Sequence, residues 1–443
     1  MSDLTQLFRD HLAKRQSDAE ESLARTGYSA LVISSGAPHT YFADDQDAPF
    51  RSVPHFTHWC PMVGPHHVIV ARSGKKPLLV RYAPEDFWYE QAPLDEQWGG
   101  TPFWAENFEI QEAGSLDAVW QAVGALLGGA YIGSETERAE AAGLAVNPDK
   151  LTKHLDWLRS TKTPYEIACL EEATHLGALG HKAAKEAFLA GASELEIHHA
   201  FVRAVGCTDA DLPYGTIVGL NEKGAILHYE GKRSHVRKGA TLLLDAGAKH
   251  CGYGSDITRT HAAPHCDERF AALLHGMEKL QLGLCAAVKP GLHYGDFHQS
   301  AHHRVAELMK EQGLLKGSAE EAVQKGWSRG FFPHGLGHHL GIQVHDVAGK
   351  QVGPDGEYLP PPPEHPFLRT TRIIEEGQVF TVEPGLYFIP MLLKPLRSDS
   401  QAAAAFDWKL IDALTPFGGI RIEDNLVVTQ DGSRNLTREK LPH

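Results

Sequence analysis

The sequence has few cysteines, no long apolar run and no excess of positive charge, and each absence excludes a class of protein. Its six cysteines include no Cys-x-x-Cys pair, which argues against a structural zinc site and favours reduced thiols in a cytoplasm. No apolar run approaches the roughly 18 residues of a membrane span, and the N-terminus shows no apolar signal segment. The net charge of −14 and the pI near 6.0 argue against a nucleic-acid partner.

The length predicts two domains, since 443 residues exceed the size of one ordinary domain. A hydrophobic content of 42% with 22% charged residues is typical of a soluble globular protein. Alternating helix and strand patterns over residues 1–160 predict a small α/β domain. A second domain is expected over residues 161–443, opening with a helix that has Pro164 near its start.

Hydrophobic periodicity and turn residues predict the elements of both domains. In the first we expect helices at 1–26, 116–127 and 148–159 and strands at 30–34, 66–71, 76–82 and 131–133. In the second, Ser193 and Glu196 have the spacing of a helix capping box, and helices are expected at 267–288 and 295–313. Strands are expected to carry His228, Asp245 and Asp256, followed by a strand-rich tail. The proline-rich run 359–366 is either a passive spacer or a loop that shapes a pocket.

Residues 331–346 contain four histidines interleaved with glycines. The glycines argue against a regular helix, and no Glu stands beside the first histidine, which excludes the HExxH zinc helix. Such a segment is either a surface loop or a backbone that brings imidazoles close to a bound group. This segment alone does not decide between the two. The four histidines are His334, His338, His339 and His345.

Four acidic residues stand in apolar surroundings elsewhere in the chain. Asp245 ends a run of three leucines, and Asp256 precedes an alternating segment. Glu383 ends an apolar run before Pro-Gly, and Glu423 follows an alternation of isoleucine and arginine. A carboxylate in such a setting is costly to bury unless a cation compensates it. One such acid is usually a turn or cap residue, but four of them with a glycine-flanked histidine are better explained by a shared metal site.

These motifs resemble those of the pita-bread metallopeptidases, and within that family those of the bacterial prolidases, which are Xaa-Pro dipeptidases. The resemblance covers roughly residues 158–429 through ordered motifs. In that family the ligands occur in the order Asp, Asp, His, Glu, Glu, and the matching residues here are Asp245, Asp256, His338, Glu383 and Glu423. The implied fold is α/β (α+β): a small N-terminal α/β domain that serves as dimerisation and lid domain, then a pita-bread catalytic domain.

Four carboxylates and one imidazole form an oxygen-rich ligand set that suits Mn²⁺, Co²⁺ or Zn²⁺ better than a thiolate-preferring metal. Two divalent ions would neutralise the four carboxylates, whereas one would leave them anionic. The resemblance implies two ions per chain, Mn²⁺ first, bridged by Asp256 and Glu423 at about 3.5–4 Å. It assigns Asp245 to one side and His338 with Glu383 to the other. A hydroxide bridging the metals would be the nucleophile, because metal binding lowers the pKa of water to about 7.

The resemblance also implies the other site residues. Glu383 would shuttle a proton to the leaving prolyl nitrogen, and imidazoles would line the site: His228, His334 and His345. Arginines would bind the free carboxylate of a dipeptide, and tyrosines would form pocket walls: Arg369, Arg421, Tyr214 and Tyr294. Considered alone, His228 is better explained as an ordinary histidine, and Arg369 has the alternative of a surface arginine.

The expected function is therefore hydrolysis of Xaa-Pro dipeptides by a cytoplasmic homodimer, with organophosphorus triesters as candidate secondary substrates and no membrane partner. The segment 41–50 resembles the part that reaches the partner's site in this family. Candidates for that role, for each of which an acidic surface loop is the alternative, are Asp44, Asp45 and Trp88. Two other functions stay open: an aminopeptidase acting before proline on longer peptides, and a metal-free binding protein. Members of the latter kind have lost ligands, and all five are present here.

Overall fold

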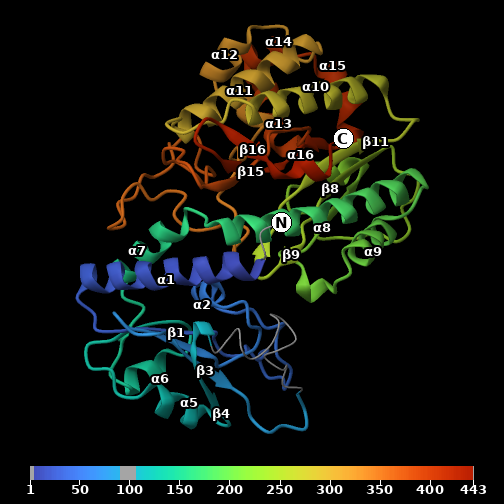
Figure 1. Ribbon diagram of the computed structural model, residues 1–443. Coiled ribbons are helices and arrows are strands. Elements are labelled where there is room, and N and C mark those ends of the chain that lie inside the picture. Colours follow the sequence, from blue (N-terminus) through green and yellow to red (C-terminus); the bar gives the residue numbers. More distant parts are fainter. Residues whose placement is uncertain (1–3, 90–105, 443) are drawn as a thin grey trace. The chain divides into compact units, whose positions relative to one another are not determined.

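The computed structural model describes residues 4–89 and 106–442, and the chain divides into two compact units. The first comprises residues 1–159, 163–168 and 353–357, and the second comprises 160–162, 169–352 and 358–443. Both units combine helices with strands (Figure 1). The division lies beside residue 160, where the sequence predicts a boundary, although two short later segments belong to the first unit.

The first unit is built on one six-stranded sheet in the order β4-β3-β2-β1-β5-β6. Strand β2 pairs antiparallel with β1 and β3, whereas the outer pairings are parallel. Helix α1 packs along α7 (Figure 1). The strands are β1 (Leu31–Ser34), β2 (Val68–Ala71), β3 (Leu78–Tyr82), β4 (Glu109–Ala113), β5 (Ala130–Ile132) and β6 (Ala145–Val146). The helices are α1 (Leu4–Thr26), α2 (Pro54–Trp59), α5 (Leu116–Val123), α6 (Thr136–Ala141) and α7 (Asp149–Arg159).

Helix α5 ends earlier than the sequence predicts. Its start follows a capping rule, since the Ser115 hydroxyl accepts a hydrogen bond from the Ala118 amide at 3.2 Å. Gly124 then takes a φ of +70°, which favours glycine and ends the helix. The expected stop at Gly128 and Gly129 was therefore four residues too late.

The second unit carries most of the helices and several small sheets. Helices α10 and α11 lie side by side (Figure 1). The helices are α8 (Pro164–Leu189, of which residues up to 168 belong to the first unit), α9 (Glu194–Val205), α10 (Glu268–Cys285), α11 (Tyr294–Glu311), α12 (Ala319–Gln324), α13 (Pro390–Ser398), α14 (Ser400–Ala405), α15 (Trp408–Leu414) and α16 (Leu436–Lys440). Short 3-10 turns are η1 (Asp209–Asp211), η2 (Asn221–Ala225), η3 (Trp327–Gly330) and η4 (Thr415–Phe417).

The strands of this unit are β7 (Ile217–Leu220), β8 (Thr241–Asp245), β9 (Lys249–His250), β10 (Tyr253–Gly254), β11 (Thr258–Ala262), β12 (Val379–Val382), β13 (Gly385–Tyr387), β14 (Gly419–Arg421), β15 (Asp424–Val428) and β16 (Ser433–Asn435). They form antiparallel sheets in the orders β11-β8-β7, β12-β15-β16, β13-β14 and β10-β9. Isolated bridges from Thr258 to Glu423 and from His339 to Phe380 connect segments outside these ladders.

Several local predictions for the second unit are confirmed. The Ser193–Glu196 capping box is present in both directions at the start of α9, and α10 and α11 occupy the two expected helical ranges. The segment 331–346 is irregular, as its glycines predict. None of the helices among the described residues has the length and apolar character needed to cross a membrane.

Three local predictions were wrong. His228 lies in a turn after η2 and not in a strand, and Asp256 lies two residues before β11 begins. The tail contains α13–α16 as well as strands. The sequence carries the signals for these helices, because Asp399 and Asp407 accept hydrogen bonds at the starts of α14 and α15.

Candidate metal centre

The five predicted ligands come from separate segments of the second unit. Asp245 is the last residue of β8, Glu383 follows β12 directly, and Glu423 lies between β14 and β15. Asp256 precedes β11, and His338 lies in the irregular glycine-rich segment. All are buried except Glu383, which is half-buried. The backbone positions of Asp245, Glu383 and Glu423 are therefore fixed by the strand pairs next to them.

Thr258 on β11 explains why two of the acids converge. It lies opposite Asp245 in the antiparallel pair β8–β11, and an isolated bridge sets Glu423 opposite it as well. The Thr258 hydroxyl donates to Oε2 of Glu423 at 2.6 Å. This hydrogen bond fixes the orientation of one carboxylate and leaves Oε1 free to face the histidine.

His338 is oriented for metal binding through Nε2. Its Nδ1 lies 3.0 Å from the His339 carbonyl oxygen and donates to it, so the neutral imidazole that binds a metal has its lone pair on Nε2. Nε2 lies 3.3 Å from Asp256, 3.7 Å from Glu383 and 4.0 Å from Glu423. An imidazole held in one tautomer by a backbone carbonyl and aimed at three carboxylates is the usual arrangement of a metal-binding histidine.

Gly337 permits this arrangement because the segment lies directly against β12. A Cβ at residue 337 would stand 1.9 Å from the Thr381 carbonyl oxygen and 2.6 Å from the Tyr294 hydroxyl. The neighbouring His338 amide donates to the Thr381 hydroxyl at 3.2 Å. A side chain at position 337 would force the histidine segment away from the strand that precedes Glu383.

The carboxylates repel one another in the absence of a cation. Burial, followed by the charges of its acidic neighbours, raises the pKa of Glu423 well above its usual value. Burial raises the pKa of Glu383 to about 7 and also raises that of Asp245. For Asp256 burial is outweighed by the His338 hydrogen bond and charge, which lower its pKa. The site is therefore built for positive charge that the protein itself does not supply in full.

The donor set fits divalent metal ions. Buried Asp245 Oδ1 has no hydrogen-bond partner, and an unpaired buried carboxylate oxygen is costly without a cation. One donor atom from each of Asp256, His338 and Glu423 lies within 4.8 Å of the others. Oxygen ligands with a single imidazole suit Mn²⁺, Co²⁺ or Zn²⁺.

A series of hydrogen bonds that was not predicted from the sequence links Asp245 to His334. Arg421 donates to Asp245 Oδ2 at 2.6 Å and to the Tyr387 hydroxyl at 3.0 Å. That hydroxyl also lies 2.8 Å from Nε2 of His334, whose Nδ1 is 3.6 Å from Glu383. The only sequence signal for Tyr387 was its position four residues after Glu383, because a tyrosine in a buried strand usually belongs to the core.

Arg421 is thus already engaged by the protein. It is buried, with Asp245 as its ion-pair partner, and its Nε donates to the Thr258 hydroxyl at 3.2 Å. Burial opposes its charge, but Tyr387 and the acids of the site outweigh burial and raise its pKa well above the usual value. The sequence predicts that Arg421 binds substrate, but most donors of its guanidinium already bind groups of the protein.

Arg369 is exposed, and its side chain forms no hydrogen bond or ion pair with the described residues. A Cβ at Gly335 would lie 3.2 Å from the Leu368 Cα and 3.5 Å from the Arg369 amide, so this segment passes directly over the backbone next to His334. Burial first, then Arg421, and less strongly His228 and Arg369, lower the pKa of His334 to about 3. The charge of Arg369 therefore contributes to the electrostatic potential at His334.

The remaining predicted residues occupy different surroundings. The Tyr214 hydroxyl donates to Asp256 Oδ1 at 2.5 Å, and the His345 ring meets that of His338 edge-on with centroids 4.4 Å apart. His228 is exposed. Tyr294 is completely buried in the core, so in this structure it supports the Gly337 backbone and offers no surface to a substrate.

In the first unit the candidates Asp44, Asp45 and Trp88 are all exposed. The Asp44 carboxylate accepts hydrogen bonds from the amides of Asp45 and Gln46, as a turn residue does. Exposed aromatic side chains are frequent in the same unit, among them Phe42, Phe87, Trp88 and Tyr89.

Comparison with known families assigns both parts of the chain. Residues 168–430 match the family described as Metallopeptidase family M24, and residues 6–157 match the family described as Xaa-Pro dipeptidase, N-terminal domain. The chain is 42% identical over 443 residues to the protein named Xaa-Pro dipeptidase from Shewanella sp. (strain MR-7), covering 99% of each. It is 41% identical, with the same coverage, to the one from Shewanella oneidensis.

Solved structures share the fold at lower identity. Proline aminopeptidase P II from Yersinia pestis superposes with a TM-score of 0.74 at 24% identity, over 97% of this chain and 96% of that one. Aminopeptidase P from E. coli, in a structure with the inhibitor Pro-Leu, gives a TM-score of 0.74 at 24% identity over 97% and 95% of the two chains. The predicted mixed α/β fold, with an N-terminal domain ahead of a pita-bread domain, is confirmed.

Proposed function

The chain belongs to metallopeptidase family M24, and from that premise we propose that it hydrolyses Xaa-Pro dipeptides in a reaction assisted by divalent metal ions. The observation that carries the proposal is the set of three carboxylates, those of Asp256, Glu383 and Glu423, within 4.0 Å of Nε2 of His338. Relatives that are 42% identical over 99% of their length bear the name Xaa-Pro dipeptidase, which supports the substrate class.

We propose two divalent ions per chain, Mn²⁺ first and Co²⁺ or Zn²⁺ as alternatives. Two such ions carry the positive charge that four carboxylates require. The hard oxygen donors of the carboxylates favour Mn²⁺, Co²⁺ or Zn²⁺. The residues that would hold them are Asp245, Asp256, His338, Glu383 and Glu423. Bound there, the ions would lower the pKa of a water and polarise the scissile carbonyl.

The chain's own groups handle the protons. Glu383 is the half-buried carboxylate of the set and is proposed to take the proton of the attacking water. It then delivers that proton to the prolyl nitrogen, which cannot leave as an anion. His334, within 3.6 Å of Glu383, is held by Tyr387 and lies beside the carboxylate that moves the proton. His345 and His228 are proposed to donate to the carbonyl oxygen as it becomes negative.

Arg369 is proposed as the anchor of the dipeptide's free carboxylate. Its guanidinium is exposed and uncommitted among the described residues, and its fork suits bidentate binding of a carboxylate. Arg421 supports the site from behind by holding Asp245. Tyr214, half-buried and hydrogen-bonded to Asp256, offers an aromatic wall for a proline ring.

We further propose a cytoplasmic homodimer whose first unit serves dimerisation. The exposed aromatic residues of that unit, Phe42 at 102% and Phe87 at 87%, are costly to leave in water and suit a covered surface. Asp44, Asp45 and Trp88 remain candidates for the part that faces the partner's substrate.

A substrate panel tests the function. The protein loaded with Mn²⁺ is assayed on Leu-Pro, Ala-Pro, a tripeptide X-Pro-Y and a neutral phosphotriester. Cleavage of the dipeptides well above the tripeptide supports the proposal, because the carboxylate of the proline itself is free to bind Arg369 only in a dipeptide. Preference for the tripeptide would assign the chain to aminopeptidases instead. Phosphotriester hydrolysis would add a secondary activity without deciding between the two.

A further inference from the structure

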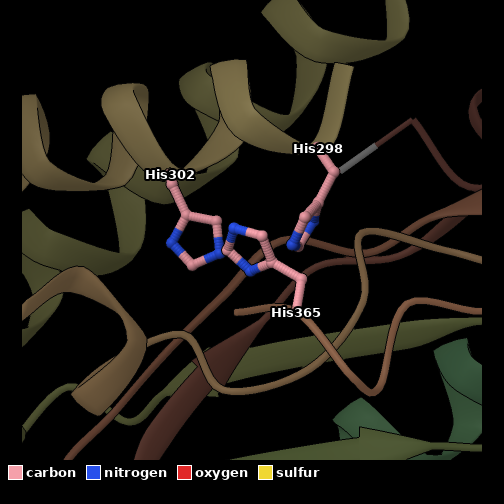
Figure 2. A group of neighbouring side chains, drawn as sticks. All are labelled: His298, His302 and His365. Carbon is pink, nitrogen blue, oxygen red and sulfur yellow. The ribbon is translucent and has the colours of Figure 1, made fainter. Parts of the chain in front are cut away.

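Three histidines outside the candidate metal centre converge in the second unit (Figure 2). His298 and His302 are one turn apart on α11, and His365 comes from the proline-rich loop. One ring nitrogen of each lies within 4.8 Å of those of the other two. Their ring centroids are 4.4–4.8 Å apart. An i, i+4 histidine pair on a helix with a third from elsewhere is an arrangement that binds transition metals.

Two nitrogens of this cluster lack partners although they are buried. His298 and His302 are each 1% exposed, and neither Nδ1 of His298 nor Nε2 of His302 has a hydrogen-bond partner. A buried polar atom without a partner costs about 1–3 kcal/mol. The two unpaired nitrogens belong to the side chains whose ring atoms approach one another, so a single ligand between them would relieve both penalties.

His302 and His365 each have a second ring nitrogen with a polar partner. Nδ1 of His302 lies 3.0 Å from the Ser328 hydroxyl, and Nε2 of His365 lies 3.2 Å from the Gln299 side-chain oxygen. An amide oxygen only accepts, so His365 carries its proton on Nε2 and its lone pair on Nδ1. Partners of this kind orient metal-binding imidazoles and fix their tautomer.

The surroundings keep the imidazoles neutral, as metal binding requires. Burial, then the charges of His365 and other neighbours, lowers the pKa of His302 to about 3, and burial lowers that of His298 well below the usual value. Arg329 is the cation nearby; it is exposed, and its Nη1 donates to the Glu364 carbonyl oxygen at 3.3 Å. At neutral pH the cluster therefore presents lone pairs and not protons.

We propose that His298, His302 and His365 bind one divalent transition-metal ion of the imidazole-preferring class, Zn²⁺ or Cu²⁺ in the first place. The cluster offers no carboxylate, so it selects against Mn²⁺ and Mg²⁺, which prefer oxygen. The ligand nitrogens of a tetrahedral zinc site are roughly 3.3 Å apart, so the three nitrogens, which lie within 4.8 Å of one another, would close on the ion. A water reaching the half-buried His365 side would complete the coordination.

Such an ion would fix the loop that leads to Arg369. The His365 carbonyl accepts a hydrogen bond from the Leu368 amide at 3.0 Å, and Leu368 lies on the Gly335 backbone. Phe332 contacts the rings of both His302 and His334, with centroids 4.8 Å and 4.9 Å apart. The ion would thus tie α11 to the loop and stabilise the segment beside the candidate centre.

The test counts metal in the full-length protein. Wild type, His365→Gln, His302→Gln and the control His303→Gln are dialysed against the same low free Zn²⁺ concentration and analysed for zinc. His303 is the next residue on α11, half-exposed, with Nδ1 3.6 Å from Glu320 and outside the cluster. We expect one zinc per chain fewer in His365→Gln and in His302→Gln, and no change in His303→Gln. Equal zinc in all four proteins would overturn the proposal.

A spectroscopic measurement separates this ion from those of the candidate centre. In the Asp256→Asn background, one equivalent of Cu²⁺ should give an electron paramagnetic resonance spectrum with coupling to three nitrogens. Adding His365→Gln, which changes a half-buried loop residue, should remove this spectrum. A spectrum with at most one nitrogen, as the carboxylate-rich centre would give, contradicts the assignment. Zn²⁺ should also raise the unfolding temperature of His303→Gln by more than that of His365→Gln, which keeps only the candidate centre; equal shifts would contradict the proposal.

Discussion

Replacing Arg369 by Met should weaken dipeptide hydrolysis and spare the metal centre. The side chain is exposed in the free protein, so only a bound dipeptide would bury the carboxylate against it. Removing one partner of a buried charge pair costs about 2–5 kcal/mol. The exposed setting selects the lower part of that range, about 2–3 kcal/mol, which is roughly a 30- to 150-fold loss in kcat/KM.

The assay compares kcat/KM for Leu-Pro with metal content in Arg369→Met, in Arg369→Lys and in a control. Arg369→Lys keeps the charge but loses the fork and should fall between wild type and Arg369→Met. The control Arg237→Met changes another exposed arginine, paired with Glu196, and should leave kcat/KM unchanged. A neutral phosphotriester, if it is a substrate, should be hydrolysed at nearly the wild-type rate. A loss below about threefold, or loss of both activities at normal metal content, would refute the role of Arg369.

Four further outcomes are expected. Arg421→Met should destabilise the metal-free protein in urea by about 3–5 kcal/mol, because buried Asp245 loses its ion-pair partner; an unchanged midpoint would contradict this. Gly337→Ala should lower metal content more than Gly335→Ala, since its Cβ would stand 1.9 Å from a carbonyl oxygen. Burial holds the pKa of His11 and His67 near 4, so as pH falls these histidines are protonated in the unfolded chain before they are protonated in the folded protein. Their contribution to the free energy of unfolding is complete above about pH 6.5 and is lost between there and pH 4, on the order of 3 kcal/mol per histidine. A chain lacking residues 1–160 should aggregate or lose activity, and a soluble, fully active monomer would rule out the proposed role of the first unit.

The carboxylates of the candidate centre were predictable because each interrupts an apolar pattern. A single charge that ends a run such as the three leucines before Asp245 is usually a turn or cap residue, but four such charges with a glycine-flanked histidine indicate a shared cation. Strand ends were harder to place, since Asp256 lies just outside β11 and His228 lies in a turn. Alternation over a few residues indicates a strand but does not locate where pairing stops.

The second layer of the site could not be predicted in the same way. Tyr387 and Thr258 matter through hydrogen bonds to residues that are distant in sequence, and a buried tyrosine or a strand threonine carries no charge to mark it. Tyr294 shows the opposite error, because a tyrosine expected at a pocket wall is fully buried. The His298–His302 spacing was present in the sequence, but its third member lies more than sixty residues away in the proline-rich loop.

The measurement that tests the central claim most directly is elemental analysis of active protein, with Asp256→Asn and Glu423→Gln prepared in parallel. Protein loaded with Mn²⁺, which the three-histidine cluster does not favour, should contain about two ions per chain, and each variant should lose metal and Leu-Pro hydrolysis together. His339→Gln, which changes a neighbouring buried histidine outside the ligand set, should retain both. Full dipeptidase activity with fewer than about one ion per chain would contradict a paired metal centre at these carboxylates.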